Sequence, residues 1–127
     1  MAVPNVSILT STKKALGIEE SYEHFDPEII MHINSVFSTL QQLGVGPDEG
    51  YAIEDKTEEW DTYFGAADPK LNSVKSYVYL KVKLLFDPPA TSFALAAFEK
   101  QTQEYEWRFT INHDSNTVAE QNATSAP

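Results

Sequence analysis

The sequence predicts an all-α fold: one compact domain of about five helices, followed by a flexible C-terminal tail. Apolar residues recur every three or four positions in four stretches of the chain, the spacing that places them on one face of a helix. Asp-Pro pairs, which suit the first turn of a helix, stand at residues 26–27 and 68–69. Glycine, the usual residue just past a helix, stands where three helices are expected to end: Gly17, Gly44 and Gly65.

The first two helices are expected over residues 5–16 and from Asp26 to just before Gly44. Asn5 is a plausible cap for the first. In the second, Asp26 caps, Pro27 suits the first helical position, and Glu28 complements the helix dipole. Its apolar positions form one stripe, which predicts a helix that buries one face. The stripe consists of Ile29, Ile33, Val36, Leu40 and Leu43, widened by Ile30 and Phe37.

A polar loop over residues 48–56 leads to a short helix from Thr57 to about Phe64, where Trp60 and Phe64 are expected to fill the core. The next helix runs from Lys70 to about Phe86, and its β-branched residues leave a strand over residues 74–85 as the alternative. Because this helix is apolar on nearly all sides, it should be central in the fold or lie in an interface. One stripe is Leu71, Val74, Val78, Val82 and Leu85, and a second is Tyr77, Leu80 and Leu84.

Pro88 and Pro89 separate this helix from the last one, expected over about residues 90–108. Its core stripe is Leu95, Phe98, Thr102, Tyr105 and Phe109, which leaves Trp107 off the stripe. An aromatic residue outside the core face, close to a flexible end, is a plausible anchor for a partner. From His113 onward the chain is polar and has little to bury, so the sequence predicts a domain over residues 1–112 and a flexible tail over residues 113–127.

Charge and composition exclude several classes of function. The formal net charge of −10 argues against binding to nucleic acid or to an anionic membrane, because both need clustered basic residues. The chain has no cysteine, which excludes disulfides and thiol catalysis. It has no stretch of roughly 20 apolar residues that could span a bilayer and no signal-peptide pattern at its start, so we expect a cytosolic origin.

No pattern of catalytic, metal-binding or cofactor-binding residues is present in the sequence. Glu28 and His32, one helical turn apart, supply two ligands at most, too few for zinc. The acidic pairs flank turns and helix starts, where carboxylates usually cap and solvate. No phosphate-binding loop, dinucleotide fingerprint or nucleophile elbow occurs. We therefore expect no cofactor and no enzymatic activity, and a role in binding other proteins.

Several segments resemble the small head–tail connector proteins of tailed phages, also called adaptor or head-completion proteins. The resemblance covers roughly residues 6–110 and depends on the number and order of short segments rather than on one motif. These segments are Ile8-Leu9 to Leu16-Gly17-Ile18, His24-Phe25-Asp26, Ile29 through Phe37, Leu43 through Pro47, Ile53 through Lys56 with Trp60, Val74 through Val82, Phe86 through Pro89, and Glu104 through Arg108.

The resemblance implies a structural protein of the virion neck that is made in the host cytoplasm. Its copies would form a ring, usually a dodecamer, between the portal protein and a stopper or tail-completion protein. The ring would extend the DNA channel and complete the head. DNA would pass through without sequence-specific binding, which an acidic channel wall would favour. A wall formed by Lys75, Lys81 and Lys83 would contradict this idea.

The resemblance also implies which residues contact partners. The C-terminal part of such proteins commonly engages the portal, which at matching positions here gives Glu104, Tyr105, Trp107, Arg108, Phe109 and Ile111. Candidates for contacts between subunits or with the stopper are Val45, Pro47, Tyr51, Ile53 and Tyr79.

Three other functions remain open from the sequence. The chain could be a different neck or tail-end assembly protein, which would not bind the portal. It could be an acidic mimic of DNA that blocks a host protein, which would act as a monomer or dimer with strong salt dependence. It could be a small enzyme that uses His32 and the acidic residues 58–61, in which case mutating them would abolish turnover.

Overall fold

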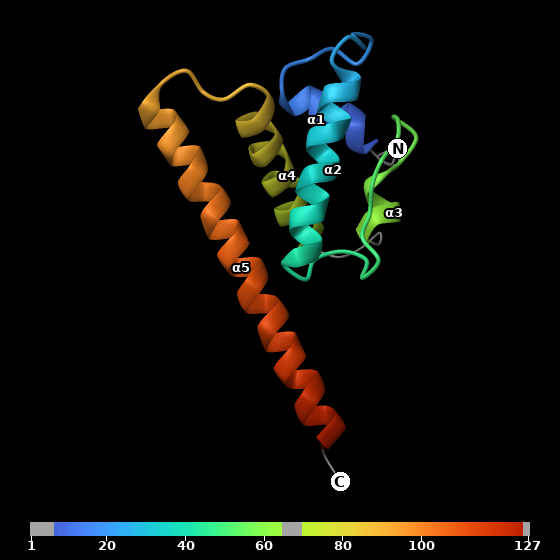
Figure 1. The fold of residues 1–127 in the computed structure, drawn as a ribbon, viewed down its shortest axis with the longest axis vertical. Helices are drawn as coiled ribbons and strands as arrows, with labels where there is room; N and C mark the ends of the chain where they lie inside the picture. Colours follow the sequence, from blue (N-terminus) through green and yellow to red (C-terminus); the bar gives the residue numbers. More distant parts are fainter. Residues whose placement is uncertain (1–6, 65–69, 126–127) are drawn as a thin grey trace, which may run out of the picture.

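The computed structural model describes residues 7–64 and 70–125, and the side chains of residues 7–63 and 70–111. This part of the chain contains five helices, α1 (Ile8–Ala15), α2 (Asp26–Gln42), α3 (Trp60–Phe64), α4 (Lys70–Phe86) and α5 (Ser92–Ser125) (Figure 1). It contains no strand, and the isolated β-bridge there joins Ser7 to Glu59. The predicted all-α fold is confirmed, and the strand alternative for residues 74–85 is wrong.

Helix α1 begins later than the sequence predicts. Its cap is Ser7, whose hydroxyl accepts a hydrogen bond from the backbone N–H of Thr10 at 3.2 Å. Asn5, the predicted cap, lies outside the described residues. The helix ends before Gly17, which has a positive φ of 79° that suits glycine. The short α1 therefore presents Ile8 and Leu9 to the core, where both are buried.

Helix α4 is central and packs against α2, α5 and α1, as its many apolar positions predict. Its bounds agree with the prediction, although the Asp68-Pro69 start signal lies outside the described residues. Leu85 is exposed, so its assignment to the buried stripe is wrong. The core between α2 and α4 consists of Ile29, Ile33, Val36, Phe37 and Leu40 from α2 and Leu71, Val74, Tyr77, Val78 and Val82 from α4.

Helix α3 begins at Trp60, three residues later than predicted, and closes one side of this core. The buried indole of Trp60 donates its N–H to Ser11 Oγ at 2.9 Å, which ties α3 to α1. Tyr63 is also buried, and its ring stacks on Phe37 with 4.5 Å between centroids. The predicted core role of Trp60 is confirmed, whereas the side chain of Phe64 lies outside the described part.

Helix α5 is longer than the predicted 90–108. It runs to Ser125, crosses α4, and extends beyond the end of the domain (Figure 1). Neither glycine nor proline occurs between Ser92 and Ser125, so no residue there forces the helix to end. The independence of residues 113–127 from the domain stays a prediction. Within the described residues, no helix has the length and apolar character needed to cross a membrane.

Candidate functional site

The six residues predicted to contact a portal divide between two faces of α5. Tyr105 and Phe109 face inward: their rings stack with 6.1 Å between centroids, and Phe109 meets Tyr77 of α4 edge-on at 5.6 Å. Phe109 is buried and Tyr105 is half-buried, so both mainly hold α5 on the domain. The four others face solvent: Glu104, Trp107, Arg108 and Ile111.

The exposed face of α5 continues toward the start of the helix as a regular strip. We call the following residues, which recur every three or four positions on the side opposite the core stripe, the outer strip: Phe93, Ala97, Lys100, Glu104, Trp107 and Ile111. Phe93 is 86% exposed, Trp107 65% and Ile111 44%. Large apolar side chains exposed on one helix face commonly mark a protein-binding surface. Trp107 was predicted to lie off the core stripe, and this is confirmed. Phe93 was not singled out, although the same spacing leads to it.

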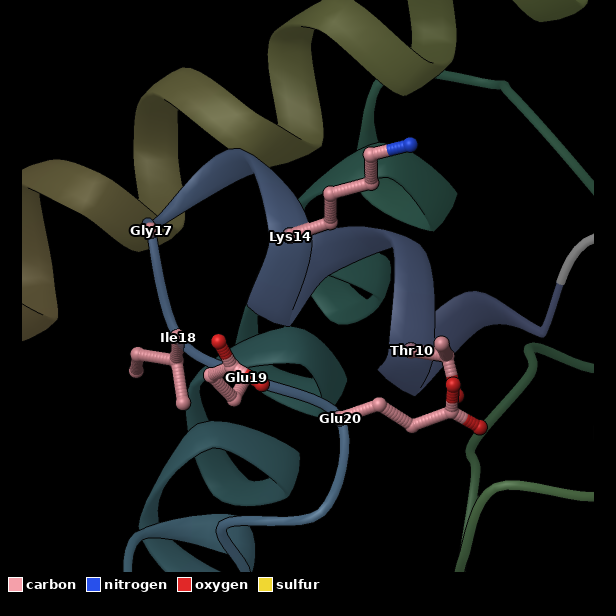
Figure 2. A pocket seen from close by; sticks show the side chains of 6 residues that line it. All are labelled: Thr10, Lys14, Gly17, Ile18, Glu19 and Glu20. Carbon is pink, nitrogen blue, oxygen red and sulfur yellow. The ribbon is translucent and has the colours of Figure 1, made fainter.

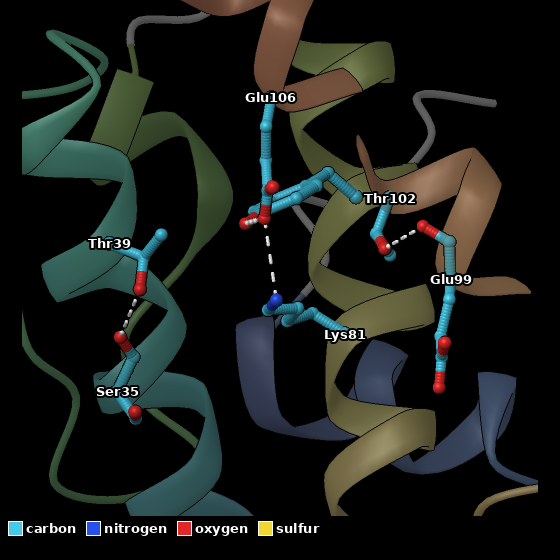
Figure 3. A network of polar contacts seen from close by, with 7 residues as sticks. Ser35, Thr39, Lys81, Glu99, Thr102 and Glu106 are labelled. Carbon is cyan, nitrogen blue, oxygen red and sulfur yellow. Dashed lines mark hydrogen bonds and ion pairs between the residues drawn. The ribbon is translucent and has the colours of Figure 1, made fainter. Parts of the chain in front are cut away.

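A polar cluster fastens α5 to α4 next to these aromatic contacts. The hydroxyl of Tyr77 donates to Glu106 Oε2 at 2.7 Å, and Lys81 Nζ lies 3.3 Å from the same oxygen (Figure 3). Burial, and then the hydrogen bond and negative charge of Glu106, raise the pKa of Tyr77 above its ordinary value. The phenol therefore stays neutral and remains a donor. Glu106 was not predicted, because its partners lie on another helix.

Of the five residues predicted to contact a neighbouring subunit or a stopper, two mainly stabilise the domain itself. Ile53 is buried, and its backbone forms two hydrogen bonds with the side-chain amide of Asn34. The backbone N–H of Ile53 donates to Asn34 Oδ1 at 2.7 Å, and Asn34 Nδ2 donates to the backbone carbonyl of Ile53 at 3.0 Å. Tyr51 meets Phe37 edge-on at 5.5 Å. A neighbouring protein could contact little of the Ile53 side chain.

The other three candidates are half-buried. Val45 and Tyr79 pack against the core, and Tyr79 lies edge-on to Trp60 at 6.1 Å between centroids. Pro47 is in the loop of residues 44–56. That loop is at the edge of the molecule opposite α5, so the structure does not bring the four candidates in the loop together with the set on α5 (Figure 1). Tyr79 is instead on α4, which packs against α5. The contact roles of all five stay predictions.

A further surface feature was not predicted as a site: three adjoining hollows beside α1 and the start of α2. They have volumes of about 340, 540 and 290 Å³. Glu19 and Glu20 line both the first and the second, and Glu23 and Lys56 line both the second and the third. Because neighbouring hollows share these residues, we describe the three together and call them the acidic groove.

Most residues that line the acidic groove are charged, and part of its lining is apolar. In the first hollow the carboxylate of Glu20 lies beside Thr10, and Lys14 points away from both glutamates (Figure 2). Leu9, Pro27 and Ile30 supply apolar lining to the third hollow, together with the charged side chains of Glu54 and Asp55. Sequence patterns could not predict this groove, because its residues come from segments far apart in the chain.

The structure gives no arrangement suited to a metal ion within the residues that it describes. No group of three or more His, Asp or Glu side chains there is placed to hold one. His32 Nε2 lies 3.7 Å from Glu28 Oε1, and the histidine ring packs edge-on to Phe86 at 6.4 Å. Among the described residues, the outer strip and the acidic groove are two surface features suited to contact another protein.

Comparison with known proteins identifies one family. The family model described as phage connector protein matches residues 8–116, which is most of the chain. No curated protein and no solved structure matches this chain.

Proposed function

The chain belongs to the phage connector protein family, and on that basis we propose that its copies form the adaptor ring between the portal and the stopper or tail of a tailed phage. The family is structural rather than enzymatic and acts in head–tail assembly. The ring, its position in the neck, and the absence of any catalytic activity are parts of the proposal. DNA passes through the centre of the ring without being read.

The single observation that supports portal binding best is the exposed C-terminal half of the outer strip. Trp107 and Ile111 lie one turn apart on the face opposite the core contacts, with Glu104 and Arg108 beside them. Aromatic and arginine side chains are the residues that most often dominate a protein interface. Because α5 continues beyond the domain at this end, these residues are accessible to a large partner (Figure 1).

The placement of the lysines supports free passage of DNA. Lys81 pairs with Glu106, Lys83 with Asp87 at 2.8 Å, and Lys75 lies over the ring of Trp60 at 5.8 Å from its centroid. These are the three lysines whose presence on the channel wall would contradict an acidic wall, and each has a partner within its own chain. With a net charge of −10 per subunit, a channel wall built from these proteins would repel DNA phosphates.

The test is to measure the mass of the purified protein alone and mixed with the portal of the same phage, by light scattering with negative-stain imaging. We expect a closed ring bound beneath the portal. Trp107→Ala should weaken portal binding at least about 10-fold, as for a central interface aromatic. Met31→Ala is the matched control: it removes an exposed apolar side chain from a different helix, α2, and should bind the portal normally.

Two results would count against the proposal. A protein that stays monomeric and ignores the portal would exclude the adaptor role and favour another neck or tail-end protein. Normal portal binding by Trp107→Ala would show that the portal contact lies elsewhere.

A further inference from the structure

We propose that neighbouring subunits join when Phe93, at the start of α5, enters the acidic groove of the next copy and Lys100 pairs with the carboxylates that line this groove. This inference rests on the proposed ring and specifies its subunit contact. The N-terminal half of the outer strip would then bind a second copy of this chain, and its C-terminal half would bind the portal.

The first support is that Phe93 has no cover within its own chain. It is 86% exposed, more than any other large apolar side chain among the described residues. Helix α5 diverges from α4 toward the end where Phe93 lies, so the domain does not fold back over it (Figure 1). Burying an exposed aromatic ring is favourable, which makes Phe93 a natural anchor.

The second support is that the third hollow of the acidic groove suits an aromatic ring. It has a volume of about 290 Å³, and Leu9, Pro27 and Ile30 in its lining offer apolar contact. Four carboxylates and one lysine also line this hollow, so its charge is negative: Glu23, Asp26, Glu54, Asp55 and Lys56. Lys100 lies two helical turns from Phe93 and is exposed, so it can reach these carboxylates when Phe93 is seated.

The third support is the placement of the two surfaces. The start of α5 lies apart from α1 and the start of α2, whose residues line the acidic groove, and all three are toward the same end of the long axis (Figure 1). Surfaces placed in this way generate head-to-tail contacts, which close into a ring when the rotation fits. Two acidic grooves facing one another would repel, which disfavours a symmetric dimer through this surface.

The experiment uses the lack of cysteine in the chain. Phe93→Cys combined with Ile30→Cys places one thiol on each proposed surface of every subunit, and oxidation should then link chains into a ladder of covalent oligomers. Phe93→Cys with Met31→Cys is the matched control, because Met31 is the next residue on α2 and is exposed. It should give no ladder. If the Ile30 variant fails to fold, Pro27→Cys, at an exposed position of the same hollow, replaces it.

A charge exchange provides a second measurement. Lys100→Glu should raise the concentration needed for ring assembly at least about 10-fold. Glu54→Lys with Asp55→Lys, added to Lys100→Glu, should restore assembly. Both variants are assayed alone and on the portal by negative-stain imaging.

The outcomes separate this inference from the proposed function. Rings on the portal with no ladder, and with no effect of Lys100→Glu, would overturn the subunit contact and leave the adaptor role intact. Equal ladders from the test and control pairs would also overturn it, because they would reflect random collision. A cross-link from Phe93→Cys to the portal itself would assign this half of the strip to the portal. Absence of any oligomer, alone or with the portal, would overturn both proposals.

Discussion

The ammonium group of Lys13 lies 2.9 Å from Asp26 Oδ1, an ion pair between the last turn of α1 and the first turn of α2. Lys13 also donates to the carbonyl of Glu20 at 2.9 Å, and its side chain is only 3% exposed. One buried cation thus joins two helices and the segment between them. That segment carries Glu19, Glu20 and Glu23 of the acidic groove.

Lys13→Met should lower the free energy of unfolding by about 3 kcal/mol, because it leaves the partly buried Asp26 carboxylate without its partner. Adding Asp26→Asn should recover a good part of this loss. Urea denaturation measures both changes. Lys14→Met, at the exposed neighbouring position, is the control and should change stability by less than about 0.5 kcal/mol. Equal effects at the two lysines would show that the pair contributes nothing.

Phe109→Ala and Trp107→Ala should differ sharply although they lie two residues apart on α5. Phe109 packs against Tyr77 and Tyr105, so its truncation should cost about 3 to 5 kcal/mol. Trp107 is exposed, so its truncation should leave thermal stability nearly unchanged. Differential scanning calorimetry distinguishes them, and a large loss of Tm in Trp107→Ala would place that residue in the core instead.

Alkaline pH should destabilise the protein through its buried tyrosines. Burial raises the pKa of both Tyr77 and Tyr63 above the ordinary value near 10, so the folded chain keeps protons that the unfolded chain releases. Their contribution to stability is complete below about pH 10 and is lost as the pH rises further. Urea denaturation at rising pH checks that stability falls. In a pH titration followed by phenolate absorbance, some of the six tyrosines should ionise at a higher pH than the others. Tyr77→Phe should shrink that late phase. A stability that rises above pH 10 would contradict the prediction.

Asn34→Ala should cost about 2 to 3 kcal/mol, because it removes two hydrogen bonds and leaves the backbone N–H of buried Ile53 without an acceptor. Asn34→Asp keeps the acceptor and loses the donor, so its cost should be smaller. Ser38→Ala, on the exposed face of the same helix, serves as the control. Hydrogen exchange at the Ile53 amide is the sensitive measurement, and unchanged protection in Asn34→Ala would refute the pairing.

Gly17 and Gly46 both have a positive φ but differ in the space around them. Substituting each with alanine therefore separates the cost of backbone strain from the cost of a steric clash. An added Cβ at Gly46 would lie 2.8 Å from the Tyr63 hydroxyl, whereas one at Gly17 would meet nothing within 4 Å. Gly17→Ala should therefore cost about 1 kcal/mol from its backbone conformation alone. Gly46→Ala should cost clearly more, because Tyr63 must also move. Thermal melts compare the stability of the two variants directly. Equal losses would mean that the Tyr63 side chain moves aside at no cost.

Sequence features of neighbouring residues predicted most of the fold. The start of α2 at Asp26 and the bounds of α4 followed from capping residues and apolar spacing, both properties of neighbouring residues. The end of α5 was missed, because polar composition lowers the tendency to bury a segment without itself breaking a helix. The cap of α1 was placed two residues early, since Asn5 and Ser7 are both good caps and tertiary packing decides between them.

The candidate surfaces were predictable only where one helix carries them. Trp107 and Ile111 face solvent as the period of α5 requires. The acidic groove, the pairing of Asn34 with Ile53 and the contact of Tyr77 with Glu106 join segments distant in sequence, which periodicity cannot bring together. Ile53 was named as a contact candidate through the resemblance, and the structure shows its side chain buried.

The crossing of α5 over α4 also has a mechanical consequence. The helix is held near Phe109 and Glu106 and continues from there to Ser125, about 24 Å of helix at 1.5 Å per residue. A tilt of about 10° at this pivot would move the far end by about 4 Å. Helix α5 can therefore act as a lever, which turns a small repacking of the Tyr77 contacts into a displacement comparable to the spacing between two packed atoms.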